Sequence, residues 1–264
     1  HVLEYDGGVH LQGSVLWFDA ARHDVLSFVS SARMDGAWRY ARALCTDRTR
    51  NLLRVYRPSF QALVSPFGRG ISLGPLQITM HPAGFMPGSA QILVESGGTR
   101  TLYACNVSLD AHEMAEAPQF VETDTLVIKA AYGLPTFAFP PRKSLRDLLV
   151  RRAREVLSRG STPVFLCSPA GKAQEVVQML MEAGLDVCVH RHIARVNQAY
   201  RALGFDPGPA RVCQAEVRQG ECAVFPERLQ HSVILRRIPK PWFIWLSGRS
   251  MLPEVRSRLR MDEG

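Results

Sequence analysis

The residues of this chain that could do chemistry are few, and they lie at the ends of apolar segments. Ser31 ends the segment FVSS, but a serine nucleophile needs a paired base, and no base is recognisable from its spacing. His190 and His192 alternate at the end of LDVCVH, and two histidines at i and i+2 can ligate a metal ion. No third ligand follows nearby, so the alternative is a polar strand end.

Cationic side chains gather in the second half of the chain. Residues 142–159 contain seven basic and two acidic side chains. Lys172 opens a helical pattern directly after an apolar strand, where a helix N-terminus can hold a phosphate. This pattern predicts nucleic-acid contacts from Arg142, Lys143, Arg146 and Lys172. The alternative is a basic face that only meets solvent.

The composition agrees with a folded, basic protein. The chain has 264 residues, a formal net charge of +8 and 46% hydrophobic residues, which excludes a disordered chain. Its basic side chains are 28 arginines and only 4 lysines. Arginine binds phosphate with two parallel hydrogen bonds, so this surplus permits nucleic-acid binding. A coding bias toward arginine would give the same count.

Segments that would direct the protein to a membrane or out of the cell are not recognisable. No apolar run approaches the roughly 20 residues of a membrane helix, and HVLEYDGGVHL does not resemble a secretion signal. Six cysteines are spread along the chain without a CxxC pair, which indicates reduced thiols. We therefore expect a cytoplasmic protein that does not bind membranes.

The secondary structure that must position these residues is predicted to change along the chain, from mostly strands to alternating helices and strands. Apolar alternation predicts strands over 15–20, 25–30, 77–83, 91–96, 100–107 and 125–133. Helical spacing covers 38–56, where Thr46 can cap a helix. Helices over 143–159, 171–184 and 193–203 then alternate with strands over 163–168 and 185–190, which is typical of a parallel sheet. Further strands are predicted over 222–227, 232–236 and 242–248.

Five segments in this order carry a family resemblance: FVSSARMDG (28–36), HPAGFMPGSAQILVE (81–95), TLYACNVS (101–108), LVIKAAYGLPTFAFPPR (126–142) and GKAQE (171–175). Together they resemble the β-CASP branch of the metallo-β-lactamase fold, whose members are nucleases of RNA and DNA processing. The similarity runs from about residue 1 to residue 250 and is greatest to bacterial DNA-ligase-associated and mRNA-end-processing exonucleases.

The resemblance implies an α/β fold with two parts. A metallo-β-lactamase-like αββα core is expected over residues 1–140, and an inserted parallel α/β domain of β-CASP type over 141–240. Residues 241–264 are expected to supply a strand that returns to the core and a basic tail. The family continues into a closing segment with a further histidine, so the fold is expected to be shortened at its C-terminus.

In that family, histidines and aspartates from these loops hold two zinc ions, which activate a water molecule and bind the scissile phosphate. Here most of the matching positions carry other residue types. Four positions at which the family has a histidine are changed, as are the position of the bridging aspartate and one further acidic position. One aspartate is retained. The resemblance therefore implies that the two-zinc site is lost, with no cofactor and no catalytic residue. The altered positions are Ser31, Arg33, Gly36, Phe85, Asn106 and Lys129, and the retained one is Asp35.

These substitutions predict a catalytically inactive pseudonuclease that serves as a nucleic-acid-binding or scaffolding subunit of a DNA- or RNA-processing or repair complex. By analogy, its partner would be another protein such as an active nuclease paralogue, a ligase or a helicase, and its ligand single-stranded DNA or RNA. Trp242, Phe243 and Trp245 are candidate interface residues. Their alternation fits an ordinary core strand equally well.

Two alternatives stay open. The first is an active metal-dependent exonuclease or phosphodiesterase with a non-standard metal site, for which Asp35, His81 and His112 are the available ligands. The second is a protein scaffold without affinity for nucleic acid.

Overall fold

The computed structural model describes residues 3–33, 36–214, 216–252 and 255. Its internal contacts form two compact units, the first comprising residues 1–129 and 202–205 and the second residues 130–201 and 206–264. The division after the first strand-rich part therefore falls near residue 130, about ten residues before the predicted boundary.

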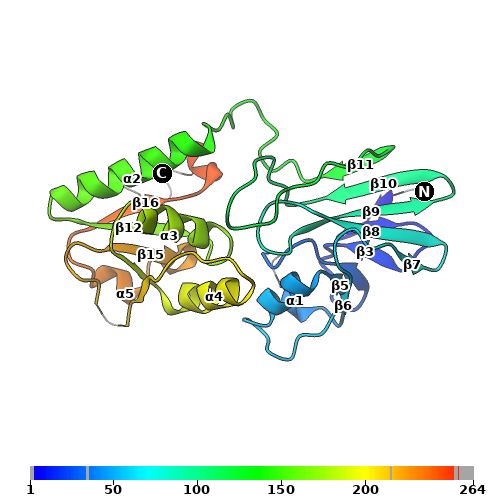
Figure 1. Cartoon of the computed structure of the whole chain (residues 1–264), viewed down its shortest axis with the longest axis horizontal. Helices are drawn as coiled ribbons and strands as arrows, with labels where there is room; N and C mark the ends of the chain where they lie inside the picture. Colours follow the sequence, from blue (N-terminus) through cyan, green and yellow to red (C-terminus); the bar gives the residue numbers. More distant parts are fainter. Residues whose placement is uncertain (1–2, 34–35, 215, 253–254, 256–264) are drawn as a thin grey trace. The chain divides into compact units, whose positions relative to one another are not determined.

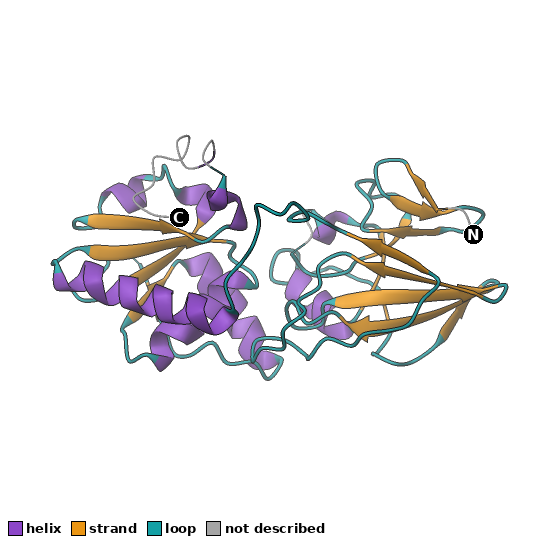
Figure 2. Cartoon of the chain, turned by 90° about the horizontal axis from the view of Figure 1, so that it is seen from above, coloured by secondary structure: helices purple, strands orange, loops and turns teal. Residues whose placement is uncertain are grey.

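The first unit contains two sheets (Figures 1 and 2). In the six-stranded sheet the strands follow their order in the chain; the first three pair antiparallel and the others in parallel. These strands are β1 (Leu3–Tyr5), β2 (Val9–Leu11), β3 (Leu16–Phe18), β4 (Leu26–Phe28), β5 (Arg42–Cys45) and β6 (Leu63–Val64).

The other sheet of this unit has the order β11-β10-β9-β8-β7. Its neighbours pair antiparallel except β10 and β11, which are parallel. Its strands are β7 (Ile71–Leu73), β8 (Leu76–Pro82), β9 (Ala90–Ser96), β10 (Thr99–Ala104) and β11 (Thr125–Ile128). The five strands predicted between residues 15 and 107 are thus confirmed.

A single apolar core joins the two sheets. Phe18, Phe28 and Leu44 from the first sheet pack with Ile78 and Ile92 from the second, and each is at most 1% exposed. Burying one such side chain contributes about 1.5–3 kcal/mol, so this core holds the loops at the strand ends in place.

The helical content of the first unit is small. Thr46 caps helix α1 (Asp47–Leu53) by accepting a hydrogen bond from the backbone N–H of Thr49, as the sequence predicts, and a short 3-10 helix, η1, covers Ala37–Arg39. The prediction of helical spacing from residue 38 onward is wrong, because strand β5 occupies 42–45. In the described part of this unit α1 is the only α-helix, and the outer helical layers of an αββα core are not seen there.

The second unit is a parallel sheet covered by helices on both faces (Figure 2). Its order is β14-β13-β15-β12-β16. The strands are β12 (Thr162–Cys167), β13 (Val187–Val189), β14 (Arg211–Val212), β15 (Cys222–Pro226) and β16 (Pro241–Trp245). The alternation of strands and helices predicted for this part of the chain is confirmed.

Helices α2 (Arg142–Ser158) and α3 (Lys172–Glu182) contribute to the core on one face of this sheet, together with the first turn of α4 (Arg191–Ala202). The other face is covered by the segment around α5 (Val233–Arg236), which follows the 3-10 helix η2 (Glu227–Leu229). A last 3-10 helix, η3, spans Gly248–Met251. None of the helices in the described residues is long and apolar enough to span a membrane.

Two predictions for the last part of the chain need correction. Strand β16 pairs in parallel with β12 inside the second unit, so residues 241–245 do not return to the first unit as predicted. An apolar strand pattern reveals the strand but not its partner. The segment 232–236 forms helix α5 rather than a strand, and Leu235 alone of its helical residues is buried. One buried side chain in four suits a single helical turn.

The aromatic residues of β16 behave as core residues. Trp242 packs against the core on one face of the sheet and Phe243 against the core on the other. The indole N–H of Trp245 donates to the Glu227 carboxylate at 3.2 Å. Of the two interpretations of this segment, the contacts favour the core strand over a protein interface.

Candidate functional site

Loops that follow three different strands meet in the first unit. The backbone N–H of Ala90 donates to the Ser30 carbonyl at 2.8 Å, and that of Ser108 donates to the Ala83 carbonyl at 2.9 Å. Asn106 Nδ2 donates to Ser31 Oγ at 3.3 Å. The loops after β4, β8 and β10 are therefore in contact, and they bring together residues that the family resemblance singles out.

The four other altered positions lie on these loops or directly after the neighbouring strand β11. The Arg33 guanidinium carbon lies 5.6 Å from the centroid of the Phe85 ring, a cation–π distance. Burial raises the pKa of the Cys105 thiol to about 11, and the Lys129 ammonium opposes that shift. Gly36 has no side chain and a φ of +73°. Asp35 lies outside the described residues.

The histidines available to a non-standard metal site make local contacts. His81 Nδ1 lies 3.1 Å from Gln119 Oε1, and His112 Nδ1 accepts the backbone N–H of Met114 at 3.3 Å. Within the described ranges, which leave out Asp35, no group of three or more histidine, cysteine, aspartate or glutamate side chains is arranged to hold a metal ion.

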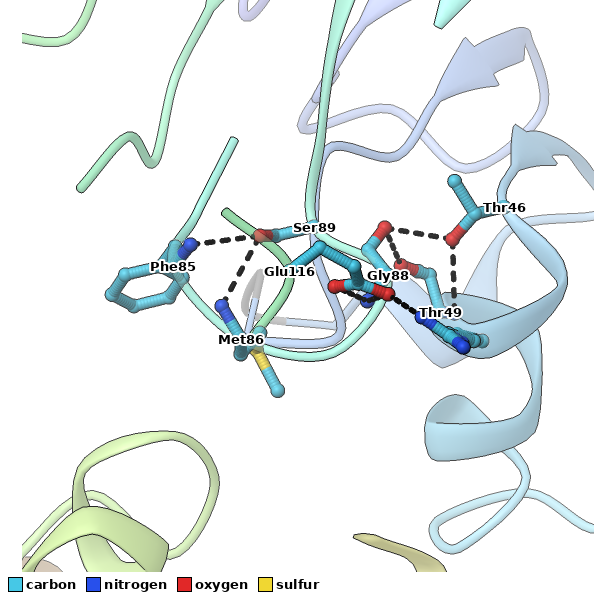
Figure 3. Close-up of polar contacts among 8 residues, drawn as sticks. Thr46, Thr49, Phe85, Met86, Gly88, Ser89 and Glu116 are labelled. Carbon is cyan, nitrogen blue, oxygen red and sulfur yellow. Dashed lines mark hydrogen bonds and ion pairs between the residues drawn. The ribbon is translucent and has the colours of Figure 1, made fainter. Parts of the chain in front are cut away.

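The loop over residues 83–89 is shaped by the serine and glycine of its PGSAQ motif (Figure 3). Ser89 Oγ accepts the backbone N–H groups of Phe85 at 3.0 Å and Met86 at 3.1 Å. The Gly88 carbonyl accepts the hydroxyl of Thr46 at 2.7 Å and that of Thr49 at 2.8 Å. These contacts fasten the loop to the start of helix α1.

A carboxylate completes this arrangement. The backbone N–H of Gly88 donates to Glu116 Oε2 at 2.9 Å (Figure 3). Glu116 also forms an ion pair with Arg48. Gln91 Nε2, from the same motif, donates to the Pro82 carbonyl at 3.1 Å. The motif residues that this chain retains are thus hydrogen-bonded within the protein.

The second retained motif, GKAQE, does the same in the second unit. Gln174 is fully buried, and its Oε1 accepts the backbone N–H of Gly171 at 2.8 Å. Its Nε2 donates to the Pro169 carbonyl at 3.2 Å and to Asn197 Oδ1 at 2.9 Å. One side chain therefore ties the turn after β12 to helix α4.

A further carboxylate at the first site escaped the sequence predictions. Asp19 follows β3 with a φ of +44°, which is uncommon for a residue other than glycine. Its Oδ1 accepts the backbone N–H of Ser30 at 2.9 Å, and its Oδ2 accepts the Tyr103 hydroxyl at 3.1 Å. Burial raises the pKa of this carboxyl, against the effect of these hydrogen bonds. An acidic residue directly after the apolar LWF strand is the signal that could have found it.

Most of the side chains of the second unit that are predicted to contact nucleic acid form bonds within the protein. Arg142 forms an ion pair with Glu175, and Arg146 forms one with Glu182 at 2.7 Å. Lys172 Nζ donates to the Leu246 carbonyl at 2.7 Å. Lys143 is exposed on α2. The four side chains therefore do not form a single free cationic surface.

His190 and His192 come together at the end of β13, although His192 belongs to the first turn of α4 rather than to a strand. Their ring centroids are 4.9 Å apart. His190 Nδ1 accepts the backbone N–H of His192 at 3.2 Å. Burial, followed by the positive charges of His192, Arg191 and Arg228, lowers the pKa of His190 to about 4.

This lowered pKa predicts acid sensitivity. The unfolded chain binds a proton at His190 near pH 6.5, whereas the folded chain does so only near pH 4, so stability falls as the pH drops through that window. We expect a loss of about 1–2 kcal/mol in the free energy of unfolding between pH 7 and pH 5. Urea titrations at both pH values measure it. H190N should remove most of this loss and H231N, at an exposed histidine, should retain it; equal pH dependence in the two variants would contradict the assignment.

Comparison with known proteins gives relatives of low identity. No protein-family profile matches the chain. It is 27% identical over 263 residues to a probable DNA ligase of Opitutus terrae, an alignment that covers 98% of this chain and 26% of that protein. It is 29% identical over 114 residues to Endoribonuclease YSH1 of Gibberella zeae, covering 42% of this chain and 13% of the relative.

A third relative is an RNase J-like protein of Methanocaldococcus jannaschii, 27% identical over 107 residues, with 40% of this chain and 25% of that protein covered. The chain thus spans about a quarter or less of the length of these relatives.

Among solved structures, a protein of unknown function from Enterococcus faecalis V583 matches 90% of this chain and 68% of its own with a TM-score of 0.58 and 12% identity. That likeness concerns the fold alone. The chain is a distant homologue of a probable DNA ligase and of ribonucleases, and these relatives suggest the metallo-β-lactamase fold of the β-CASP nucleases that its motifs resemble.

Proposed function

We propose that this chain is a catalytically inactive relative of the β-CASP nucleases, which have a two-zinc site that this chain has lost. In this proposal it acts in the cytoplasm as a nucleic-acid-binding or scaffolding subunit of a DNA- or RNA-processing or repair complex. The names of its relatives, a DNA ligase and ribonucleases, support nucleic acid as the molecule on which the complex works.

The observation that carries the proposal is the contrast between retained and altered motif residues. Gly88, Ser89 and Gln174 are retained, and each is hydrogen-bonded within the protein, Gly88 to side chains and the other two to backbone N–H groups. The altered positions offer a hydroxyl at Ser31, a guanidinium at Arg33 and a phenyl ring at Phe85.

Zinc in proteins takes imidazole, thiolate and carboxylate ligands, so the residues described at these positions do not fit a two-zinc group. Asn106 and Lys129 add a neutral amide and a cation. Two positive side chains, Arg33 and Lys129, would also repel a pair of dications. The chain therefore retains motif residues of the family without the ligands that the chemistry needs.

Elemental analysis and a nuclease assay test the loss of the metal site. We expect zinc far below one ion per chain after purification in zinc-containing buffer, and no cleavage of end-labelled single-stranded DNA or RNA that a chelator stops. Stoichiometric zinc with chelator-sensitive cleavage would overturn the proposal. If cleavage is observed, a D35A/H81A variant identifies its source. Loss of cleavage in this variant would indicate the non-standard metal site, and unchanged cleavage would indicate a contaminating nuclease.

A pure scaffold is the second candidate, and the intramolecular pairing of Arg142, Arg146 and Lys172 favours it. Binding of a labelled single strand at increasing salt discriminates between the two. If the chain contacts two or three phosphates, its affinity should fall by about tenfold between 50 and 200 mM salt. No binding at 50 mM salt would favour the scaffold.

A heteromeric partner is also part of the proposal. Co-purification from the native cell, followed by identification of the bound chains and nucleic acid, tests it. We expect a nuclease, a ligase or a helicase among the stoichiometric partners. Recovery of the chain alone under gentle conditions would count against a stable complex.

A further inference from the structure

A group of basic side chains in the second unit lies at the carboxyl end of its parallel sheet. His190 follows β13, and Arg228 lies in η2, directly after β15. Strands β13 and β15 are neighbours in the sheet, so side chains that follow them come together at one edge. Open parallel sheets bind ligands outside the carboxyl ends of their strands. We call His190, His192, Arg191 and Arg228 the histidine–arginine cluster.

The hydrogen bonds of this cluster fix which atoms carry protons. The Nη2 atom of Arg228 lies 2.7 Å from His192 Nδ1. Because a guanidinium only donates, the histidine nitrogen accepts and its ring proton is on Nε2. His190 Nδ1 likewise accepts a backbone N–H. Both rings are therefore held as neutral imidazoles whose Nε2–H is a donor.

Among the described residues, the two arginines of the cluster are not paired with a carboxylate. Every charge that shifts the pKa of His190 or His192 is positive, and the first turn of α4 has no acidic residue. Glu227, next to Arg228, accepts the Trp245 indole N–H. Over the described residues, neither Arg191 nor Arg228 has a carboxylate partner.

Three arginines elsewhere in the same unit differ in this respect. Arg142, Arg146 and Arg211 each form an ion pair with a glutamate. The basic helix α2, which the sequence favours for phosphate contacts, is therefore partly neutralised. In contrast, the arginines of the histidine–arginine cluster have no carboxylate partner among the described residues and lie beside preorganised donors. Both properties suit a phosphate group.

We propose that the histidine–arginine cluster binds a phosphate group of single-stranded nucleic acid. This inference rests on the proposed nucleic-acid binding and names the surface responsible. A guanidinium and two imidazole N–H groups supply the hydrogen bonds, and the backbone N–H groups at the start of α4 add a favourable dipole.

Two variants with the same charge change test the site. Arg228 and Arg237 are both exposed, but only Arg228 belongs to the cluster. We expect R228E to weaken binding of a labelled 12-nucleotide single strand at 50 mM salt by at least about tenfold, as for the loss of a charge-assisted contact. R237E should change binding less than threefold. Equal effects of the two variants would overturn the proposed site while leaving nucleic-acid binding intact.

An NMR titration keeps this test separate from the proposed function. Inorganic phosphate, and then adenosine 5′-monophosphate, should shift the ring signals of His190 and His192 but not those of His81 and His112. If these shifts occur but no single strand binds, the cluster is an anion site and the proposed nucleic-acid binding fails. Unshifted His190 and His192 signals at saturating phosphate would overturn the inference, and signals that shift in R228E as in the wild type would indicate an adventitious ion only.

Discussion

G88A should lower the free energy of unfolding by about 3–5 kcal/mol, the sum of a left-handed backbone penalty and overpacking. Gly88 has a φ of +75°, and a Cβ there would lie 2.6 Å from Thr46 Oγ1, from the Thr49 backbone nitrogen and from Arg48 Cβ. Neither the Thr49 backbone nitrogen nor the capping hydroxyl of Thr46 can move without disrupting the start of helix α1. Urea unfolding of the purified chain measures the loss.

Gly97 provides the matched control for this substitution. Its φ is +58°, and a Cβ there meets nothing within 4 Å, so G97A includes the backbone penalty without the clash. We expect it to cost about 1–2 kcal/mol. If the two variants lose the same stability, close packing between the 83–89 loop and α1 is not what requires glycine at position 88.

Q174L should cost about 3–5 kcal/mol, because it leaves three buried polar groups without a partner at about 1–3 kcal/mol each, partly relieved by relaxation. The groups are the Gly171 N–H, the Pro169 carbonyl and the Asn197 side chain. Leucine has nearly the same volume as glutamine, so the loss of stability measures the unpaired polar groups rather than a cavity. Thermal and urea unfolding measure it.

The control for Q174L is Q198L on helix α4, where the side chain is exposed and little change is expected. A double-mutant cycle with N197L sharpens the result. If Gln174 and Asn197 stabilise each other directly, the double variant should lose clearly less stability than the two single variants together. Additive losses would contradict this coupling.

The parts of the fold that follow from local pattern were predictable. The Thr46 cap, the buried strand β12 and the three long helices of the second unit each leave a signal within a few residues. Strand partners do not leave such a signal: β16 has the composition of a core strand, but only the packed sheet shows that it lies beside β12. The short helix α5 was missed because β-branched residues usually favour strands.

For the candidate site, the sequence motifs predicted which loops lie together but not the contacts that their side chains make. That Ser31, Phe85 and Asn106 belong to neighbouring loops follows from the family resemblance, and the structure brings these loops together. The ion pairs of Arg142 and Arg146 were not predictable, because their glutamate partners lie more than thirty residues away on α3. The histidine–arginine cluster depends in the same way on Arg228, which is distant in sequence from His192.

The order of strands in the second sheet has a consequence for how the chain folds as it is synthesised. β12 ends at Cys167, but both strands that flank it come later, at 222–226 and 241–245. At about 5–20 residues per second, a ribosome needs several seconds to produce them. Until β15 is synthesised the apolar β12 has no sheet neighbour, so this unit depends on late, long-range pairing and is exposed to aggregation or to chaperones during that time.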